Sequence, residues 1–387
     1  MNRLTTLILC LWTALAVNGQ DSLVIKLDSL LSHPMFQTTQ VGLMVYDLTA
    51  DSVLYERNAR QLMRPASTMK VVTAITALDR LGGDYAYRTR ICHTGTLANG
   101  RLNGDLYCVG GFDPTLTTDD IKAMAENLHQ QGVDTLQGNV IADLTMKEAL
   151  DYGEGWCWDD KNPLLTPLSV GRKNNFLNQL VQEMANDSIV LIDTNIMESR
   201  CPDDATLLTT CQHSIDQILL RMMKNSDNFY AESMFYQIAA HVAGQRTAKA
   251  SDGRQAIKQL IRKIGLNADS YRFADGSGLS LYNYVSAELE TMLLRYAWRN
   301  QRIYAHLYPA MPIAGEDGTL EKRMKGEFTQ GNVHAKTGTL TGISSLAGYC
   351  TAFNTHQLAF CIINQGVMRN QDGKDFQDRV CAVLCEP

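Results

Sequence analysis

Apolar residues recur every three or four positions between Thr68 and Leu81, which predicts a helix buried on most of its circumference. The stretch RPASTMKVVTAITALDRLGG places a serine, Ser67, and a lysine, Lys70, on the opening turn of this helix. Because residues three apart share a helix face, the two side chains are expected to point the same way. Ser67 is then either an N-cap beside a solvated lysine or a nucleophile beside its base. The four-residue motif S-x-x-K by itself favours the N-cap.

Strands are predicted near both ends of the chain, with helices between them. VGLMVYDLTADSVLYERN alternates like a β-hairpin with its tip at residues 47–51, and residues 331–366 alternate like three strands in meander order. Strands from the two ends can pair in one antiparallel sheet covered by helices, so we expect an α+β fold. Helical patterns cover residues 118–131, 214–244, 252–264, 286–298 and 374–385.

The pattern changes in the middle of the chain. Between about Ile91 and Cys211 it consists of short strands, several turn signals and one amphipathic stretch. We therefore expect residues 91–211 to form an inserted domain. The surrounding residues 20–90 and 212–387 would form the main domain around the predicted sheet.

The N-terminal residues have the pattern of a secretory signal peptide. MNRLTTLILCLWTALAVNGQDS has one early arginine, an apolar run of about fourteen residues and small residues that would allow cleavage after Gly19. The apolar run is shorter than the roughly twenty residues that span a bilayer, so we expect no transmembrane anchor after cleavage. Residues 1–19 are thus predicted to be removed, and the mature protein is expected to be periplasmic or otherwise extracytoplasmic.

Composition changes this picture in two ways. The 387-residue chain has a formal net charge of -6, and no basic face for phosphates is indicated, so we expect no nucleic-acid partner. Nine of its ten cysteines follow the signal peptide, which suits an oxidising compartment and leaves at least one unpaired. Their spacing lacks paired C-x-x-C motifs with matching histidines, so no zinc site is expected. We expect disulfides between Cys350 and Cys361 and between Cys92 and Cys108, each pair lying on two short neighbouring strands.

Two further motifs accompany Ser67. KNSDNFY places Ser226 and Asn228 in a short break between two helices, and HAKTGTL places K-T-G at residues 336–338 on a strand. Each motif alone is open to a structural explanation such as helix capping. The order S-x-x-K, S-D-N, K-T-G makes those explanations jointly improbable, because it is the motif set of serine β-lactamases and penicillin-binding proteins.

The motif set supports a coherent nucleophilic mechanism. A serine hydroxyl needs a base, and Lys70 lies one turn from Ser67. The helix N-terminus, partial burial and a second cation, Lys336, are all expected to lower the pKa of Lys70. The backbone amides of Ser67 and Thr339 are expected to form an oxyanion hole.

The remaining motif residues are assigned to the substrate. Ser226 is expected to relay a proton to the leaving amine, and Asn228 to hold the substrate amide. Lys336 and Thr337 are expected to bind a terminal carboxylate, and Gly338 to let the substrate backbone approach the strand.

Over most of residues 40–370, the chain resembles the D-alanyl-D-alanine carboxypeptidases/endopeptidases among the low-molecular-mass class C penicillin-binding proteins. Besides the three motifs, the similar stretches are GDLYCVGGFDPTLTTDDIKAMAENLHQQGVDTLQGNVIAD, GEGWCWDD, FADGSGLSLYN and MPIAGEDGTLEKRMKG. The resemblance implies a serine β-lactamase/transpeptidase-like domain, an antiparallel sheet with helices on both sides. Residues 71–225 are short for this family, so one inserted domain in trimmed form is expected.

The resemblance also implies an activity. The chain would be a serine-type D-Ala-D-Ala carboxypeptidase, and possible endopeptidase, that acts on peptidoglycan stem peptides through an acyl-serine and needs neither metal nor cofactor. β-Lactam antibiotics would acylate it covalently. Two alternatives stay open, a serine β-lactamase-like hydrolase and a catalytically silent cell-wall-binding or sensor domain. A slowly reversed penicillin adduct would separate the enzyme alternatives, and the chain lacks the E-x-x-L-N motif of class A β-lactamases.

In this family an acidic residue of a GWxWxD stretch faces the free amine of a diaminopimelate side chain. Asp160 matches it, with Trp156 beside it, although the two residues are also suited to packing and capping a turn. Where the family often has an arginine after DGSGLS, this chain has Leu281. We therefore expect dependence on the side-chain amine through Asp160 and weak discrimination of the side-chain carboxylate.

Overall fold

A computed structural model describes residues 22–387 except 158, 161 and 245. Its central element is a five-stranded antiparallel sheet in the order β12-β13-β14-β1-β2. β1 pairs with β14 along its whole length, so the two ends of the chain meet in one sheet as the sequence predicts. The strands are β1 (Gln40–Asp47), β2 (Ser52–Arg57), β12 (His334–Leu340), β13 (Ile343–Thr351) and β14 (Gln357–Gln365).

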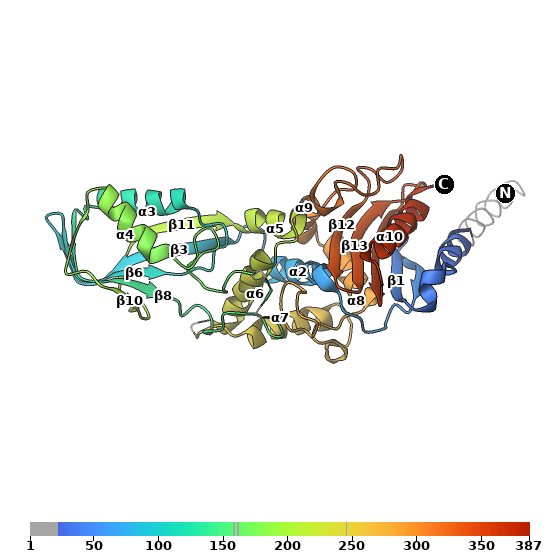
Figure 1. Cartoon of the computed structure of the whole chain (residues 1–387), viewed down its shortest axis with the longest axis horizontal. Helices are drawn as coiled ribbons and strands as arrows, with labels where there is room; N and C mark the ends of the chain where they lie inside the picture. Colours follow the sequence, from blue (N-terminus) through green and yellow to red (C-terminus); the bar gives the residue numbers. More distant parts are fainter. Residues whose placement is uncertain (1–21, 158, 161, 245) are drawn as a thin grey trace, which may run out of the picture.

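Helices cover both faces of this sheet (Figure 1). On one face α10 (Asn370–Cys385) packs against β13, and on the other α8 (Ala287–Arg299) packs against β14 and β1. α2 (Met69–Leu81) packs in turn against α8. Because side chains alternate along a strand, the neighbours Leu346 and Ala347 on β13 lie in different apolar cores. The expected α+β fold, with helices on both sides of the sheet, is confirmed.

The remaining helices of this part surround α2 or adjoin α8. The apolar pattern does not predict α9, because Asn300 both ends α8 and begins α9 without a connecting loop. α10 begins at Asn370, four residues before the predicted start at residue 374. These helices are α5 (Ile215–Lys224), α6 (Asn228–Ala243), α7 (Ala250–Lys263) and α9 (Gln301–Ala310).

The middle of the chain forms two smaller sheets that lie at the opposite end of the elongated molecule from α10 and the C terminus (Figure 1). The expected domain limits at residues 91 and 211 fall inside strands β3 and β11. Two helices, α3 (Thr118–Gln130) and α4 (Phe176–Asn186), pack together here, and the pattern does not predict α4. One sheet has the order β10 (Ile196–Glu198), β8 (Val140–Asp143), β6 (Leu106–Val109), β3 (Ala86–His93) and β11 (Thr206–Ser214), and the other β4 (Thr96–Ala98), β5 (Arg101–Asn103), β7 (Thr135–Gln137) and β9 (Val190–Ile192).

Both expected disulfides are wrong, because the strand register separates the cysteines. In the β13–β14 pair, Cys350 lies opposite Leu358 and therefore three positions from Cys361, an odd offset that puts the two thiols on opposite faces. In the β3–β6 pair, Cys92 lies opposite Tyr107 and is offset by one position from Cys108. The thiols in each pair accordingly belong to different apolar clusters, and all nine cysteines of the described residues are free.

Two expectations concern export. The predicted signal peptide, residues 1–19, lies outside the described residues. Within the part of the chain that the structure covers, no helix combines the length and the apolar character needed to cross a membrane.

Candidate active site

Ser67 lies in a short 3-10 turn, Ala66–Thr68, that leads directly into α2. The capping alternative for Ser67 is wrong. The N-cap position of α2 is Thr68, and no side chain forms a capping hydrogen bond to the turn or to the helix. The hydroxyl oxygen of Ser67 instead lies 3.0 Å from the Nζ atom of Lys70. The expected nucleophile and base therefore share a face of the helix start.

Lys70 is completely buried, and its amine has three hydrogen-bond partners from three separate segments. Nζ lies 3.0 Å from Ser67 Oγ, 2.7 Å from Asn228 Oδ1 and 2.8 Å from the carbonyl oxygen of Ser277. A neutral amine has two protons, which suit the two obligate acceptors Asn228 Oδ1 and Ser277 O. Its lone pair is then left to accept the proton of the Ser67 hydroxyl.

The burial of Lys70 adjusts its basicity. Burial lowers the pKa of Lys70 to about 7, although the negative charges of Asp275 and Glu232 act in the opposite direction. A base with a pKa near the working pH combines a large neutral fraction with useful proton affinity. The sequence predicts the direction of this shift, and burial is its main cause.

Lys336 is the second buried lysine of the site. From β12 its Nζ donates to Ser226 Oγ at 2.8 Å and to the Thr337 carbonyl oxygen at 2.7 Å. Burial, and then the charge of Lys70, lower the pKa of Lys336 well below its ordinary value. Ser226 occupies the break between α5 and α6 with a φ of 58°, an uncommon conformation for a residue with a side chain.

Asn228 is held at the first position of α6. The preceding residue, Asp227, caps the helix by accepting from the amide of Phe229 at 3.1 Å, and it forms ion pairs with Arg172 and Arg221. Asn228 Nδ2 also donates to Asn162 Oδ1 at 3.4 Å, so the inserted segment contacts the motif. These contacts fix the amide that binds Lys70.

Gly338 lies in a close packing contact with the turn that carries Ser67. A Cβ atom at this position would lie 2.1 Å from Ser345 Oγ, 2.7 Å from the Pro65 carbonyl oxygen and 2.9 Å from the Ser67 amide nitrogen. The absence of a side chain therefore lets β12 lie directly against the turn that carries Ser67. β12 is an edge strand, and the next residue, Thr339, is exposed on it.

Thr337 lies partly exposed on the same strand. Its hydroxyl donates to the Thr319 hydroxyl at 2.7 Å. The structure thus places the three motifs around Ser67, with the two lysine side chains buried and Thr337 and Thr339 closer to solvent.

The loop at residues 275–283, within the stretch FADGSGLSLYN, belongs to none of the three motifs but supports the site. Asp275 is almost completely buried and accepts from the amides of Gly278 at 2.8 Å and Ser280 at 2.7 Å. Glu232 of α6 accepts from the Ser277 amide at 2.8 Å, and burial raises the pKa of Glu232 to about 8. The two carboxyl groups fix the loop so that the Ser277 carbonyl points at Lys70.

Trp156 contacts this loop, and Asp160 lies four residues after Trp156 in the chain. Trp156 Nε1 donates to Asp275 Oδ2 at 2.8 Å, which connects the inserted segment to the loop that orients Lys70. Asp160 Oδ2 accepts from the Cys157 amide at 2.7 Å and so caps its own turn. Leu281 is 48% exposed, and its carbonyl accepts from Arg64 Nε at 2.9 Å.

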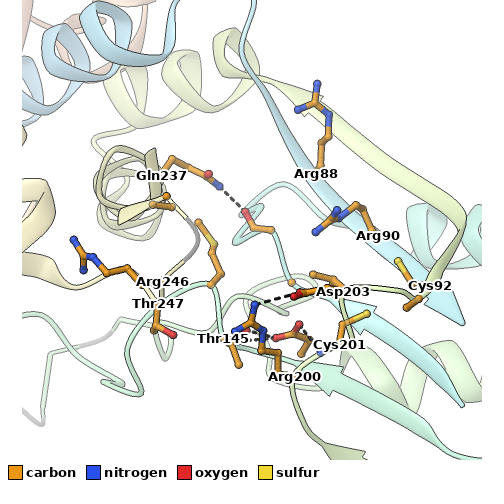
Figure 2. Close-up of a pocket in the computed structure, with 18 of the residues that line it drawn as sticks. Arg88, Arg90, Cys92, Thr145, Arg200, Cys201, Asp203, Gln237, Arg246 and Thr247 are labelled. Atoms are coloured by element: carbon orange, nitrogen blue, oxygen red, sulfur yellow. Dashed lines mark hydrogen bonds and ion pairs between the residues drawn. The ribbon is translucent and has the colours of Figure 1, made fainter. Parts of the chain in front are cut away.

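A large cavity lies elsewhere in the molecule. It has a volume of about 980 Å³, lies between the inserted segment and α6, and contains none of the motif residues (Figure 2). Arginines 88, 90, 200 and 246 line it, and Arg200 is paired with Asp203 at 3.3 Å. The geometry around Ser67, rather than cavity size, therefore identifies the candidate active site.

Comparison with protein families and curated relatives gives one consistent result. Residues 23–169 and 162–386 match the family described as "D-Ala-D-Ala carboxypeptidase 3 (S13) family". The chain is 26% identical to the D-alanyl-D-alanine carboxypeptidase of Actinomadura sp. strain R39, over 88% of this chain and 80% of the relative. It is 24% identical to the D-alanyl-D-alanine carboxypeptidase DacB of Haemophilus influenzae, over 85% of this chain and 86% of the relative.

The fold agrees with these matches. The crystal structure of penicillin binding protein 4 from Haemophilus influenzae superposes with a TM-score of 0.83 and 22% identity, covering 92% of this chain and 97% of that one. The same protein was also solved in complex with a β-lactam, and that structure superposes with a TM-score of 0.76.

The contact between Gly338 and Ser67 yields a prediction. Gly338→Ala should slow covalent labelling by a fluorescent penicillin by about 10²-fold, because the new Cβ must push β12 away from the Ser67 turn and misalign the site. Labelling reactions quenched at a series of times give the rate, and thermal unfolding checks that the variant is folded.

Gly326→Ala is the matched control, because its Cβ would meet only Thr329 Oγ1 at 3.3 Å. Its labelling rate should equal that of the wild type. A Gly338→Ala variant that labels at the wild-type rate would show that this contact does not set the active-site geometry.

Proposed function

Because the chain belongs to the D-Ala-D-Ala carboxypeptidase 3 (S13) family, we propose that Ser67 is the nucleophile with which it cleaves the D-Ala–D-Ala bond of peptidoglycan stem peptides. The observation that carries this assignment is the 3.0 Å contact between Ser67 Oγ and the buried Nζ of Lys70. The chain is a serine-type carboxypeptidase by family, and the proposal concerns which residues perform each step.

The first step is acylation of the serine. Neutral Lys70 accepts the Ser67 proton while Oγ bonds to the substrate carbonyl carbon. The amides of Ser67 and Thr339 stabilise the negative charge that develops on the carbonyl oxygen. As the C–N bond breaks, the proton passes to the departing D-Ala amine through Ser226, which Lys336 holds at 2.8 Å.

The terminal carboxylate of the substrate binds at β12. The Thr337 and Thr319 hydroxyls, which are 2.7 Å apart, lie at the more exposed end of the motif and serve as donors. Lys336 lies beneath them, and an arriving carboxylate favours its charged form. Asn228 is held by Lys70 and Asn162 at the other side, where it binds the substrate amide.

Deacylation completes the reaction. Lys70 takes a proton from water, the hydroxide attacks the acyl carbon, and Ser67 Oγ recovers its proton as the shortened peptide leaves. In a β-lactam the leaving nitrogen stays tethered to the acyl group, so we propose that the same serine forms a persistent adduct with these drugs. Cleavage of D-Ala cross-links follows the same chemistry with a different leaving amine.

We propose that residues 1–19 are a signal peptide and that the enzyme acts outside the cytoplasm, where its peptidoglycan substrate is found. We also propose that the inserted domain runs from β3 to β11, residues 86–214, because these strands pair with each other along their length.

The nucleophile assignment predicts a complete loss of function in one variant. Ser67→Ala should abolish both covalent penicillin labelling and the release of D-Ala from a pentapeptide, while its melting temperature stays near that of the wild type. Ser270→Ala, which alters an exposed serine, is the control and should retain both activities. Persistent labelling of Ser67→Ala would refute the assignment, and rapid release of the penicillin adduct from the wild type would favour a β-lactamase.

Selectivity for the third residue of the peptide provides a second prediction. Asparagine at position 160 keeps an oxygen that accepts from the Cys157 amide but removes the negative charge. We therefore expect Asp160→Asn to lower kcat/KM by about tenfold on pentapeptides with lysine or diaminopimelate at position three. The wild type should discriminate weakly between diaminopimelate and its amidated form, because Leu281 replaces a carboxylate-binding arginine.

Asp159→Asn is the matched control, since it removes a neighbouring exposed charge. Equal activity of Asp160→Asn and wild type on every substrate would remove Asp160 from the site. A strong preference for the free carboxylate would instead indicate Arg64, whose Nε lies 2.9 Å from the Leu281 carbonyl oxygen, as a replacement cation.

A further inference from the structure

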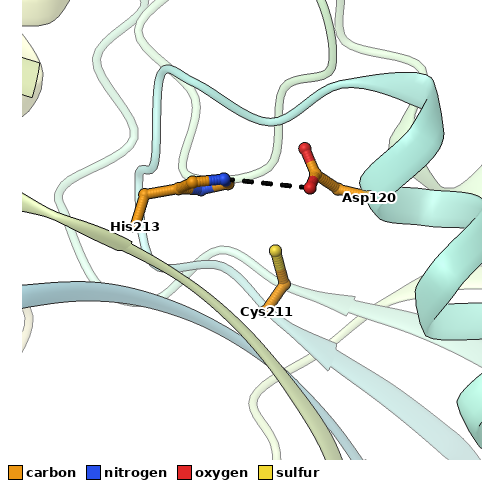
Figure 3. A group of neighbouring side chains, drawn as sticks. All are labelled: Asp120, Cys211 and His213. Atoms are coloured by element: carbon orange, nitrogen blue, oxygen red, sulfur yellow. Dashed lines mark ion pairs between the residues drawn. The ribbon is translucent and has the colours of Figure 1, made fainter. Parts of the chain in front are cut away.

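Three side chains of the inserted segment converge outside the active site. Asp120 of α3 and Cys211 and His213 of β11 each place one potential ligand atom within 4.8 Å of the other two (Figure 3). Cys211 and His213 are two residues apart on a strand, so they project from the same face, and α3 packs against that strand. This is the one such group found among the described residues.

The imidazole of His213 is already oriented by a second carboxylate. Its Nδ1 lies 2.6 Å from Oδ2 of Asp113, a residue almost completely buried. Asp113 is fixed in turn because its Oδ1 accepts from the Thr115 amide at 2.9 Å. Nδ1 is thus engaged by Asp113, and Nε2 faces Asp120, as in the carboxylate–histidine pairs that commonly support metal sites.

Asp120 is also held through one oxygen, and its other oxygen faces His213. Its Oδ2 accepts from the Thr117 amide at 2.8 Å and from the Thr117 hydroxyl at 2.7 Å, in a capping box at the start of α3. Its Oδ1 lies 3.8 Å from His213 Nε2. The helix cap therefore directs the second carboxylate oxygen at the imidazole.

We propose that Asp120 Oδ1, Cys211 Sγ and His213 Nε2 bind a Zn²⁺ ion, with Asp113 orienting the histidine from behind. Thiolate, imidazole and carboxylate together are a donor set typical of zinc. With bonds of about 2.1 Å, a tetrahedral ion separates its nitrogen and oxygen ligands by about 3.4 Å, close to the observed 3.8 Å. Paired cysteine motifs, the sequence signal of a zinc site, are absent from this set, which forms only because α3 packs against β11.

The surroundings leave room for a fourth ligand. The side chains of His213 and Asp120 remain 17% and 24% exposed, so a water molecule has access to the ion. The bound ion would join α3 to β11, the strand that leads directly into α5 and the S-D-N motif. Its role is therefore to stabilise the packing of α3 against β11 within the inserted domain rather than to take part in peptide cleavage.

The same side chains also allow a metal-free arrangement. A protonated His213 between Asp113 and Asp120 would form two ion pairs, at 2.6 and 3.8 Å, with Cys211 as a bystander thiol. The two arrangements differ in their need for Cys211. The thiol is a ligand in the first and dispensable in the second, so Cys211 is the residue to test.

The experiment uses the untagged mature chain, stripped with a chelator and dialysed against micromolar Zn²⁺. We expect one zinc per chain by elemental mass spectrometry, and we expect Co²⁺ loading to give a thiolate-to-cobalt charge-transfer band. Cys211→Ser and His213→Gln should lose stoichiometric zinc and the band, and Asp113→Asn should weaken zinc affinity by about 10- to 100-fold.

Two matched controls test specificity. His356→Gln removes an imidazole that also lies 2.6 Å from a carboxylate, Asp47 Oδ2, and Cys157→Ser removes an exposed thiol. Both should bind zinc as the wild type does. Absence of stoichiometric zinc and of the cobalt band in the folded wild type, or full zinc binding by Cys211→Ser, would overturn the proposal. None of these outcomes depends on peptidase activity, so the proposed function stands or fails separately.

Discussion

The site depends on the burial of the Lys70 amine, which has no carboxylate within hydrogen-bond distance among the described residues. Lys70 has no solvent exposure, and a charged ammonium in such a place is strongly disfavoured. Its amine is matched instead by neutral partners, the Ser67 hydroxyl, the Asn228 amide oxygen and the Ser277 carbonyl. These partners come from three segments far apart in the sequence. Lys70 therefore becomes a functional base only when the core has packed correctly around it.

The surrounding structure supports each partner in turn. Asp275 and Glu232 hold the loop that presents the Ser277 carbonyl, and Asp227 caps the helix that presents Asn228. The inserted segment reaches both supports, since Trp156 binds Asp275 and Arg172 pairs with Asp227. The segment between β3 and β11 thus contributes directly to the shape of the candidate site.

Much of the fold follows from local patterns, and much of the site from three short motifs. The strands near both chain ends, α2 and the break at Ser226 are all evident in the sequence, because each is encoded by neighbouring residues. The role of Asp275 is not, since its partners Trp156 and Gly278 become neighbours only through tertiary packing. The predicted cysteine pairs were wrong for a related reason. Whether two residues on paired strands share a face depends on the strand register, which alternation alone does not determine, as Cys350 and Cys361 show.

The central claim is that Lys70 is a neutral base at physiological pH. Nuclear magnetic resonance of chain labelled with ¹³C at the lysine side chains measures this directly, with the Lys70 signal assigned by its loss in Lys70→Met. We predict that the Lys70 signal titrates with a pKa of about 7. Titration near the ordinary lysine value of about 10.4 would contradict the account, because the base would then be protonated when the serine has to react.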